Sequence, residues 1–108
     1  MKKVTARALE KSIAHWDRLA NNKARDGEVV DARDCALCDR FNAGAGGCVY
    51  RGEYCPVRIK TGRRYCYSTP YYEARQHHRI ERHNRQSGYF QDEARNMRDF
   101  LISLREVA

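Results

Sequence analysis

A small α+β domain stapled by a metal ion is the fold class that this sequence predicts, on three observations. All five cysteines of the 108-residue chain lie between Cys35 and Cys66. Apolar residues recur at helical spacing near both ends of the chain, which predicts amphipathic N- and C-terminal helices that pack together. Short runs with glycine at their turns predict hairpins between the cysteines, and a basic middle helix is expected after them.

The length of 108 residues suits a single domain spanning residues 1–108. Charged residues make up 32% of the chain and apolar residues 42%. A domain this small buries a modest share of its surface, so a bound metal would add stability. No run approaches the roughly 20 apolar residues of a membrane span, and the first residues contain no signal-peptide block. We therefore expect a cytoplasmic protein without a membrane partner.

The first expected element is a helix over residues 4–24. Its apolar stripe consists of Leu9, Ile13, Trp16, Leu19 and Ala20. Trp16 lies in register with the stripe and is expected to anchor the core, whereas His15 lies off the stripe and is expected to face solvent. Asp26 and Gly27 are expected to close the helix, because glycine accepts the left-handed conformation common at such ends.

The cysteine-rich module covers residues 35–66. Its cysteines are Cys35, Cys38, Cys48, Cys55 and Cys66. A Cys-x-x-Cys pair lets the chain curl around one ion, and zinc takes four thiolates in tetrahedral geometry. The preferred ligands are Cys35, Cys38, Cys48 and Cys55, with Cys66 as the alternate for Cys48. Hairpins around Arg51-Gly52 and around Thr61-Gly62 would return ligands to the ion.

Other chemistries also use clustered cysteines. An iron–sulfur cluster takes the same ligands, so the spacing does not separate it from zinc. A disulfide framework suits short secreted chains, but the odd number of cysteines argues against it. A redox Cys-x-x-Cys pair would need a βαβ context, which this sequence lacks. One zinc ion held by four of the five cysteines is the preferred prediction, with an iron–sulfur cluster as the alternative.

The basic middle helix is expected over residues 70–86. Thr69 is placed to cap its first amides, and Pro70 suits the first helical position. Residues 51–86 carry nine basic and three acidic groups, which is +6 of the net charge of +7. A local excess of this kind attracts polyanions. The candidate anion-binding residues are Arg58, Lys60, Arg63, Arg64, Arg75, Arg79 and Arg82.

Histidines in this helix are similar to those of metal-dependent nucleases of the His-Asn-His type. The residues concerned are His77, His78, His83 and Asn84. Such a nuclease takes its general base from a strand and a metal ligand from the following helix, so that a water is activated against a phosphodiester. Here the histidines fall in one predicted helix, at spacings that do not converge on one ion. The sequence therefore favours a non-enzymatic protein.

The last expected element is an amphipathic helix over residues 90–107. Its apolar stripe consists of Phe90, Ala94, Met97, Leu101 and Leu104, broadened by Phe100. This stripe and that of the first helix are expected to face each other. Met97 is expected to fill the core rather than to bind a metal.

Several short motifs resemble those of small cysteine-rich proteins encoded by tailed bacteriophages. The motifs are Lys11-Ser12-Ile13, His15-Trp16, Cys35-Ala36-Leu37-Cys38, Cys55-Pro56, Cys66 and Thr69-Pro70. The likeness covers roughly residues 9–73. That family usually has a second close pair, Cys-x-x-Cys-Pro, whereas six residues separate Cys48 from Cys55 here. The resemblance implies a phage accessory protein acting in the cytoplasm of the infected bacterium, and it implies no activity.

Two functions of different classes follow. The preferred one is a non-enzymatic, zinc-stabilised accessory protein whose basic face binds nucleic acid or a nucleotide. The alternative is an inhibitor in host takeover or counter-defence that binds an acidic surface of a host protein. A nuclease of the His-Asn-His type comes third.

Overall fold

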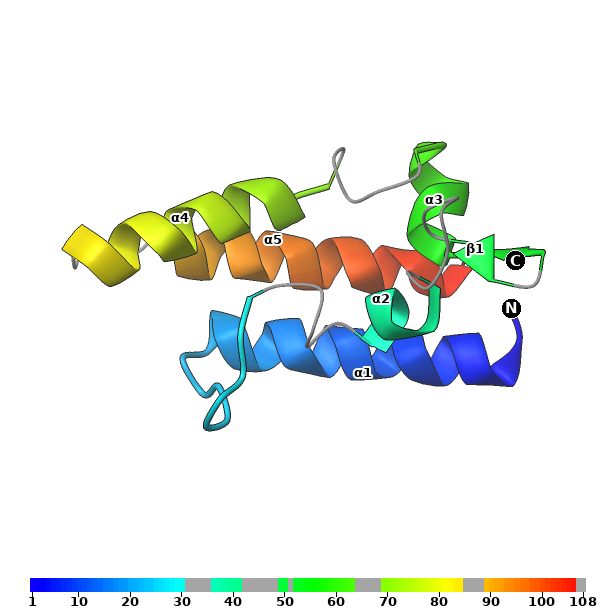
Figure 1. Cartoon of the computed structure of the whole chain (residues 1–108), viewed down its shortest axis with the longest axis horizontal. Coiled ribbons are helices and arrows are strands. Elements are labelled where there is room, and N and C mark those ends of the chain that lie inside the picture. The colour runs from blue at the N-terminus through cyan, green and yellow to red at the C-terminus, as the bar shows by residue number, and fades with distance from the viewer. Residues whose placement is uncertain (31–35, 42–48, 51, 64–68, 85–88, 107–108) are drawn as a thin grey trace.

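The computed structural model describes residues 1–30, 36–41, 49–50, 52–63, 69–84 and 89–106, with backbone alone at 39, 50 and 80–84. Three long helices dominate the architecture: α1 (Lys3–Ala20), α4 (Tyr71–Asn84) and α5 (Tyr89–Ser103). Short elements connect α1 to α4, and a single 3₁₀ turn (Leu104–Glu106) extends α5. Figure 1 shows α1 on one side of α5 and α4 on the other.

α1 and α5 run antiparallel and side by side (Figure 1). Leu9 and Trp16 from α1 and Leu101 from α5 are each 1% exposed. Two ion pairs join α1 to α5 and to the 3₁₀ turn after it: Asp17 lies 2.8 Å from Arg98, and Glu10 lies 2.6 Å from Arg105. The two apolar stripes therefore meet, and the terminal helices pack together as expected.

α1 ends at Ala20, four residues before the expected boundary. Asn22 takes a left-handed conformation with φ of 57°, which asparagine tolerates better than most residues. The amide of Lys23 then donates to the carbonyl oxygen of Arg18 at 2.8 Å. Gly27, with φ of 79°, instead shapes a separate turn in which the Glu28 amide donates to the Arg25 carbonyl oxygen at 3.0 Å.

The first expected hairpin is present. Strands β1 (Val49–Tyr50) and β2 (Glu53–Tyr54) pair antiparallel, with Val49 opposite Tyr54. Gly52 lies in the turn with φ of 80°, a value that favours glycine. Each strand has only two residues, so this hairpin contributes little to the core.

The second expected hairpin is wrong. Its residues form a helix, α3 (Pro56–Thr61), and Gly62 is the left-handed cap of that helix with φ of 72°. Proline at the first helical position and glycine just past the end favour a short helix over a hairpin. Val57 is 2% exposed, so α3 packs one side against the core.

The expectation of an α+β metal-stapled domain is also wrong. The described residues are mainly helical and contain one two-stranded sheet. Among them, no group of three or more His, Cys, Asp and Glu side chains could hold a metal ion. Apolar packing from α1, α5 and the short elements forms the core instead, with Phe41 of α2 (Ala36–Phe41) and Leu104 both 0% exposed.

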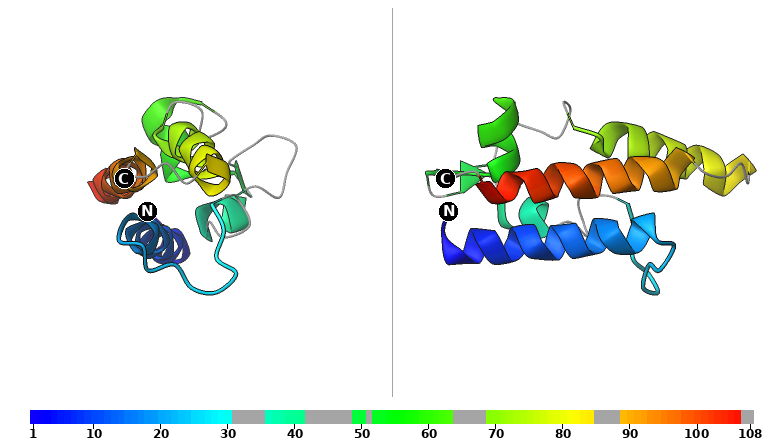
Figure 2. Two further views of the ribbon diagram at one scale, coloured as in Figure 1. Left: turned by 90° about the vertical axis from the view of Figure 1, so that its left-hand side faces the viewer. Right: turned by 180° about the vertical axis from the view of Figure 1, so that it is seen from behind.

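α4 forms close to its expected place. The amide of Tyr71 donates to Thr69 Oγ1 at 3.2 Å, so the predicted cap is confirmed. Ala74 is 0% exposed, and the Trp16 and Tyr71 rings meet edge to face at 6.0 Å. The start of α4 is thereby fixed against α1, while the rest of the helix lies along α5 (Figure 2).

Candidate nucleic-acid interface

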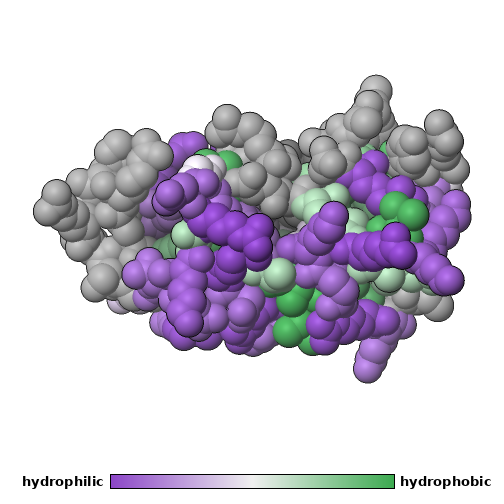
Figure 3. Space-filling model, turned by 90° about the horizontal axis from the view of Figure 1, so that it is seen from below, coloured by the Kyte–Doolittle hydropathy of each residue, from purple (hydrophilic) through white to green (hydrophobic). Residues whose placement is uncertain are grey.

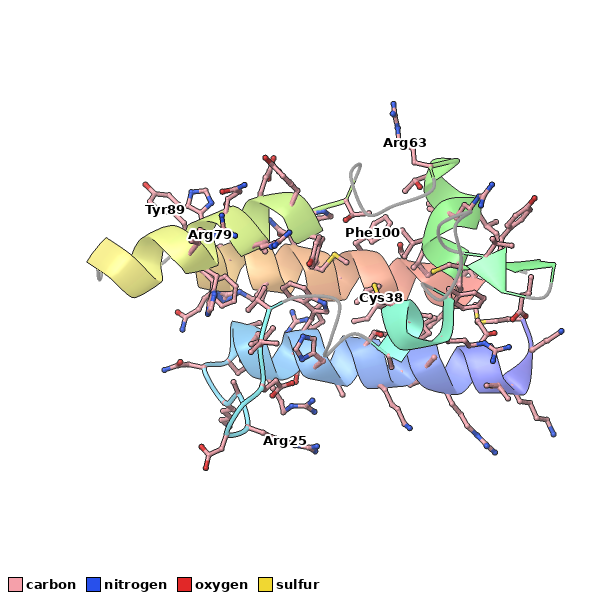
Figure 4. The ribbon with its side chains drawn as sticks, in the orientation of Figure 1. Arg25, Cys38, Arg63, Arg79, Tyr89 and Phe100 are labelled. Atoms are coloured by element: carbon pink, nitrogen blue, oxygen red, sulfur yellow. The ribbon has the colours of Figure 1, made fainter. Side chains whose placement is uncertain are left out.

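Three of the predicted anion-binding residues lie in α3 or just after it. Arg58 is half-buried, and its guanidinium carbon lies 4.3 Å from the centre of the Tyr54 ring, a cation–π contact. Lys60 and Arg63 are exposed. Figure 4 shows the Arg63 side chain pointing away from the body of the protein. α3 therefore holds Arg58 against an aromatic ring and leaves the other two cations in solvent.

α4 presents a cationic outer face. Arg75 and Arg79 are exposed, and the exposed fraction of Tyr72 is 52%. Spacings of three and four residues put Tyr72, Arg75 and Arg79 on one side of the helix, away from the buried Ala74. An aromatic ring and two guanidinium groups are thus available together on the same surface.

α3 and α4 both lie on the side of the molecule opposite α1 (Figures 1 and 2). In Figure 4 Arg63 and Arg79 are well separated along that side. We call Lys60, Arg63, Arg75 and Arg79 the α3–α4 basic surface. Of the other predicted residues, Arg64 and the side chain of Arg82 lie outside the described part of the chain.

Ion pairing distinguishes this surface from most arginines outside residues 51–86. Among the described residues, the arginines that pair with a carboxylate within 4.0 Å are Arg18, Arg40, Arg95, Arg98 and Arg105, all outside residues 51–86. Within the described residues, no Asp or Glu pairs with any member of the α3–α4 basic surface. Among these described residues, no carboxylate therefore neutralises the positive charge of the surface.

A buried polar cluster connects α1 to the turn after it, and the sequence reasoning missed it. His15 is 2% exposed, so the expectation that it faces solvent is wrong. Its Nδ1 contacts Glu28 Oε2, and Arg18 Nη2 donates to the same oxygen at 2.8 Å. The amide of Arg25 donates to Glu28 Oε1 at 2.8 Å. Helical periodicity could not predict this contact, because Glu28 lies outside α1 and reaches it only through the turn at Gly27.

The hydrogen bond from Arg18 is the largest influence on Glu28 and lowers its pKa. Burial raises the pKa, and the contacts from Arg25 and His15 lower it, so that it falls from the usual 4.5 to about 2. Glu28 is therefore ionised at neutral pH. The other ring nitrogen of His15, Nε2, is buried and has no hydrogen-bond partner among the residues that the structure describes.

A second polar network joins α1, α2 and β2. Thr5 Oγ1 donates to Glu53 Oε1 at 2.8 Å, and Arg40 Nη2 donates to the same oxygen at 2.8 Å. Arg40 Nε also donates to Thr5 Oγ1 at 3.0 Å. Glu53 is one of the three acidic residues of the basic segment 51–86, yet it pairs with Arg40, which lies outside that segment. Glu53 therefore does not neutralise a cation of residues 51–86.

The histidines of α4 contact α5. His77 Nδ1 lies 2.7 Å from Glu93 Oε1, and the His78 ring centre lies 4.9 Å from that of Phe90. The side chain of His83 lies outside the described residues. Within the described part of the chain, the imidazoles therefore serve helix packing, and the nuclease alternative has no geometric support there.

Cys38 and Cys55 are the two cysteines that the structure describes. Cys38 lies in α2 and is half-buried, and Cys55 precedes α3 and is 3% exposed. Cys35, Cys48 and Cys66 lie outside the described residues. Zinc binding and its iron–sulfur alternative therefore stay predictions.

No helix in the described ranges is long and apolar enough to cross a membrane. No protein-family model matches this chain, and comparisons with curated proteins and with solved structures find no significant match.

Proposed function

We propose that this protein binds the phosphate backbone of nucleic acid through the α3–α4 basic surface, without reading base sequence. The observation that carries the proposal is the pattern of ion pairing. Five described arginines elsewhere pair with carboxylates, whereas Lys60, Arg63, Arg75 and Arg79 have no acidic partner within the described residues. Lysine and arginine side chains that neutralise phosphates supply most of the affinity of non-specific nucleic-acid binding.

An extended ligand suits this surface better than a mononucleotide. Lys60 and Arg63 come from α3 and the turn after it, and Arg75 and Arg79 come from α4. Figure 4 shows Arg63 and Arg79 well separated on one side of the molecule, so a single phosphate group cannot contact all four cations. A strand with regularly repeated phosphates reaches both helices. The exposed ring of Tyr72, beside Arg75 and Arg79 on α4, adds a surface on which an unpaired base could stack.

Titration of a fluorescent duplex at several salt concentrations tests the proposal. Contacts from four cations predict that log K falls with log salt at a slope of about −3.6. Between about 50 and 200 mM salt the affinity should therefore fall about a hundredfold. Substituting Arg75→Gln and Arg79→Gln together should weaken binding at least about tenfold and reduce the slope by about 2.

The matched control is Lys23→Gln with Arg25→Gln. Both residues are exposed in the turn after α1, and Figure 4 shows Arg25 on the side of the molecule away from α4. This control removes the same number of charges and should leave affinity nearly unchanged. Equal losses in both double variants would mean that net charge, and not the α3–α4 basic surface, attracts the ligand.

An acidic protein is the other partner that a basic surface can bind. Affinity capture from bacterial lysate, with and without nuclease treatment, separates the two. The proposal predicts that nuclease releases whatever the protein retains. A protein partner that stays bound after nuclease treatment, and is lost in the Arg75→Gln, Arg79→Gln variant, would instead support the inhibitor hypothesis.

A further inference from the structure

α1 carries a second row of cations, on the opposite side of the molecule from α4. Lys3, Arg7 and Lys11 are all exposed and repeat every four residues. They therefore follow one side of the helix over about 12 Å. We call these three residues the α1 basic stripe. Figure 3 looks onto the α1 side of the molecule, and hydrophilic residues cover most of the described part of that face.

This row works against the stability of its own helix. Like charges four residues apart repel each other. Lys3 also lies in the first turn of α1, where the helix dipole is positive, and no acidic residue lies in that turn. A bound anion would remove both unfavourable terms. The stability of the helix therefore does not explain why these three positions are all cationic.

The acidic residues of α1 do not compensate the stripe. α1 contains two of them, Glu10 and Asp17. Glu10 pairs with Arg105 at 2.6 Å and Asp17 with Arg98 at 2.8 Å, so both are committed to the edge that faces α5. In the described residues, no carboxylate pairs with the α1 basic stripe.

The net charge of the N-terminal segment does not reveal the α1 basic stripe. Residues 1–34 carry eight basic and six acidic groups, a small excess that does not suggest a binding site. The fold separates the two signs, because the carboxylates of α1 pair with arginines from α5 and from the 3₁₀ turn after it, while its outer cations face solvent.

We infer that the α1 basic stripe is a second phosphate-binding surface, so that one chain holds two segments of nucleic acid together. The inference rests on the proposed function of the α3–α4 basic surface. Figures 1 and 2 show α1 and α4 on opposite sides of the bundle, so one straight duplex cannot lie against both. An anionic membrane is a poorer match for the stripe, because the apolar face of α1 is buried against α5 and is not available for insertion.

A bridging assay tests the inference. A biotinylated duplex is fixed to beads, a fluorescent duplex is added with the protein, and the fluorescence captured on the beads is measured. Wild-type protein should capture the second duplex. The Arg7→Gln, Lys11→Gln variant should capture at least about fivefold less, while binding of one free duplex at the α3–α4 basic surface persists. Its binding stoichiometry, titrated well above Kd, should fall from two duplexes per chain to one.

The Lys23→Gln, Arg25→Gln variant is the matched control and should bridge like wild type. Bridging that is undiminished in Arg7→Gln, Lys11→Gln would overturn the inference, as would wild-type protein that binds one duplex per chain and captures no second one. Neither result contradicts the proposed function, which fails instead if Arg75→Gln, Arg79→Gln binds duplex with the same affinity and the same number of duplexes per chain as the control variant does.

Discussion

Glu28 is the residue whose position matters most to the polar contacts around α1. It lies in a turn, thirteen positions after His15, and its carboxylate accepts hydrogen bonds from Arg18 and from the amide of Arg25. Its side chain is 7% exposed, so removing its charge leaves the half-buried Arg18 guanidinium without its carboxylate. Breaking a buried pair in this way is strongly destabilising.

The pH dependence of stability follows from the lowered pKa of Glu28. In the folded chain that pKa is about 2, against the usual 4.5. The unfolded chain therefore binds the proton more readily, and the contribution of Glu28 is present above about pH 4.5 and lost as the pH falls toward 2. A shift of this size corresponds to at most about 3 kcal/mol.

Urea denaturation between neutral and acidic pH, on wild type and Glu28→Gln, measures this contribution. At neutral pH the variant should be less stable by about 2 kcal/mol, and the difference should shrink below about pH 4.5. Glu106→Gln, which changes an exposed carboxylate near the end of the described chain, is the control. A difference that stays constant down to pH 2 would show that the lowered pKa does not stabilise the fold.

At the scale of the element, the α1–α5 pair contains two kinds of contact that differ in strength. Leu101 is 1% exposed and packs in the core. The Arg105 and Glu10 side chains are 50% and 52% exposed, so water and salt screen their attraction. The ion pairs help to set which helix edges meet, and the apolar contacts supply the stability.

Two substitutions, four residues apart in the sequence, distinguish the apolar contacts from the ion pair. Leu101→Ala should lower the free energy of unfolding by about 2–5 kcal/mol, because it removes buried methyl groups and leaves a cavity. Arg105→Ala should lower it by less than about 1 kcal/mol. Chemical denaturation of both variants gives the two values. A larger loss in Arg105→Ala would mean that electrostatics dominates the helix pair.

At the scale of the whole molecule, stability is expected to be uneven. α1 contributes buried residues along most of its length, including Leu9, Ile13 and Trp16. Among the described side chains of α4, the buried one is Ala74, and contacts such as His77 with Glu93 supplement it. Helices with few buried apolar contacts open at lower free energy than core helices do.

Hydrogen exchange should therefore be faster in α4 than in α1 and α5. Amides beyond the capped first turn of α4 are expected to exchange first, and nucleic acid bound at the α3–α4 basic surface should slow them. Exchange followed by mass spectrometry resolves the three helices. Equal protection of α4 and α5 in the free protein would show that the bundle opens as one unit.

Local pattern predicted the long helices well. The stripes of α1 and α5 were identifiable because helical periodicity is expressed over several turns, and Thr69-Pro70 marked the start of α4 through local capping chemistry. α3 was missed because a six-residue helix shows too little periodicity to be told from a turn. Thr61-Gly62 resembles a hairpin turn in sequence, because glycine with a positive φ is found both in such turns and at the ends of helices, and Gly62 is the cap of α3.

The candidate site was only partly accessible from the sequence. Charge counting located the cations of α3 and α4, because nine basic residues in one segment exceed three acidic ones. It overlooked the α1 basic stripe, because counting adds charges that the fold moves to different edges of a helix. Helical periodicity assigned His15 to solvent, because Glu28, the residue that contacts it, lies in a turn outside the helix.

Sequence alone determined which segments become long helices, which of their faces are apolar, and that positive charge is concentrated after residue 50. These properties depend on residues within a few helical turns of one another. The tertiary structure alone decided which carboxylates neutralise which arginines, and hence which cations remain for a ligand. Pairs such as Glu10 with Arg105 join residues 95 positions apart, and only packing brings such residues within hydrogen-bonding distance.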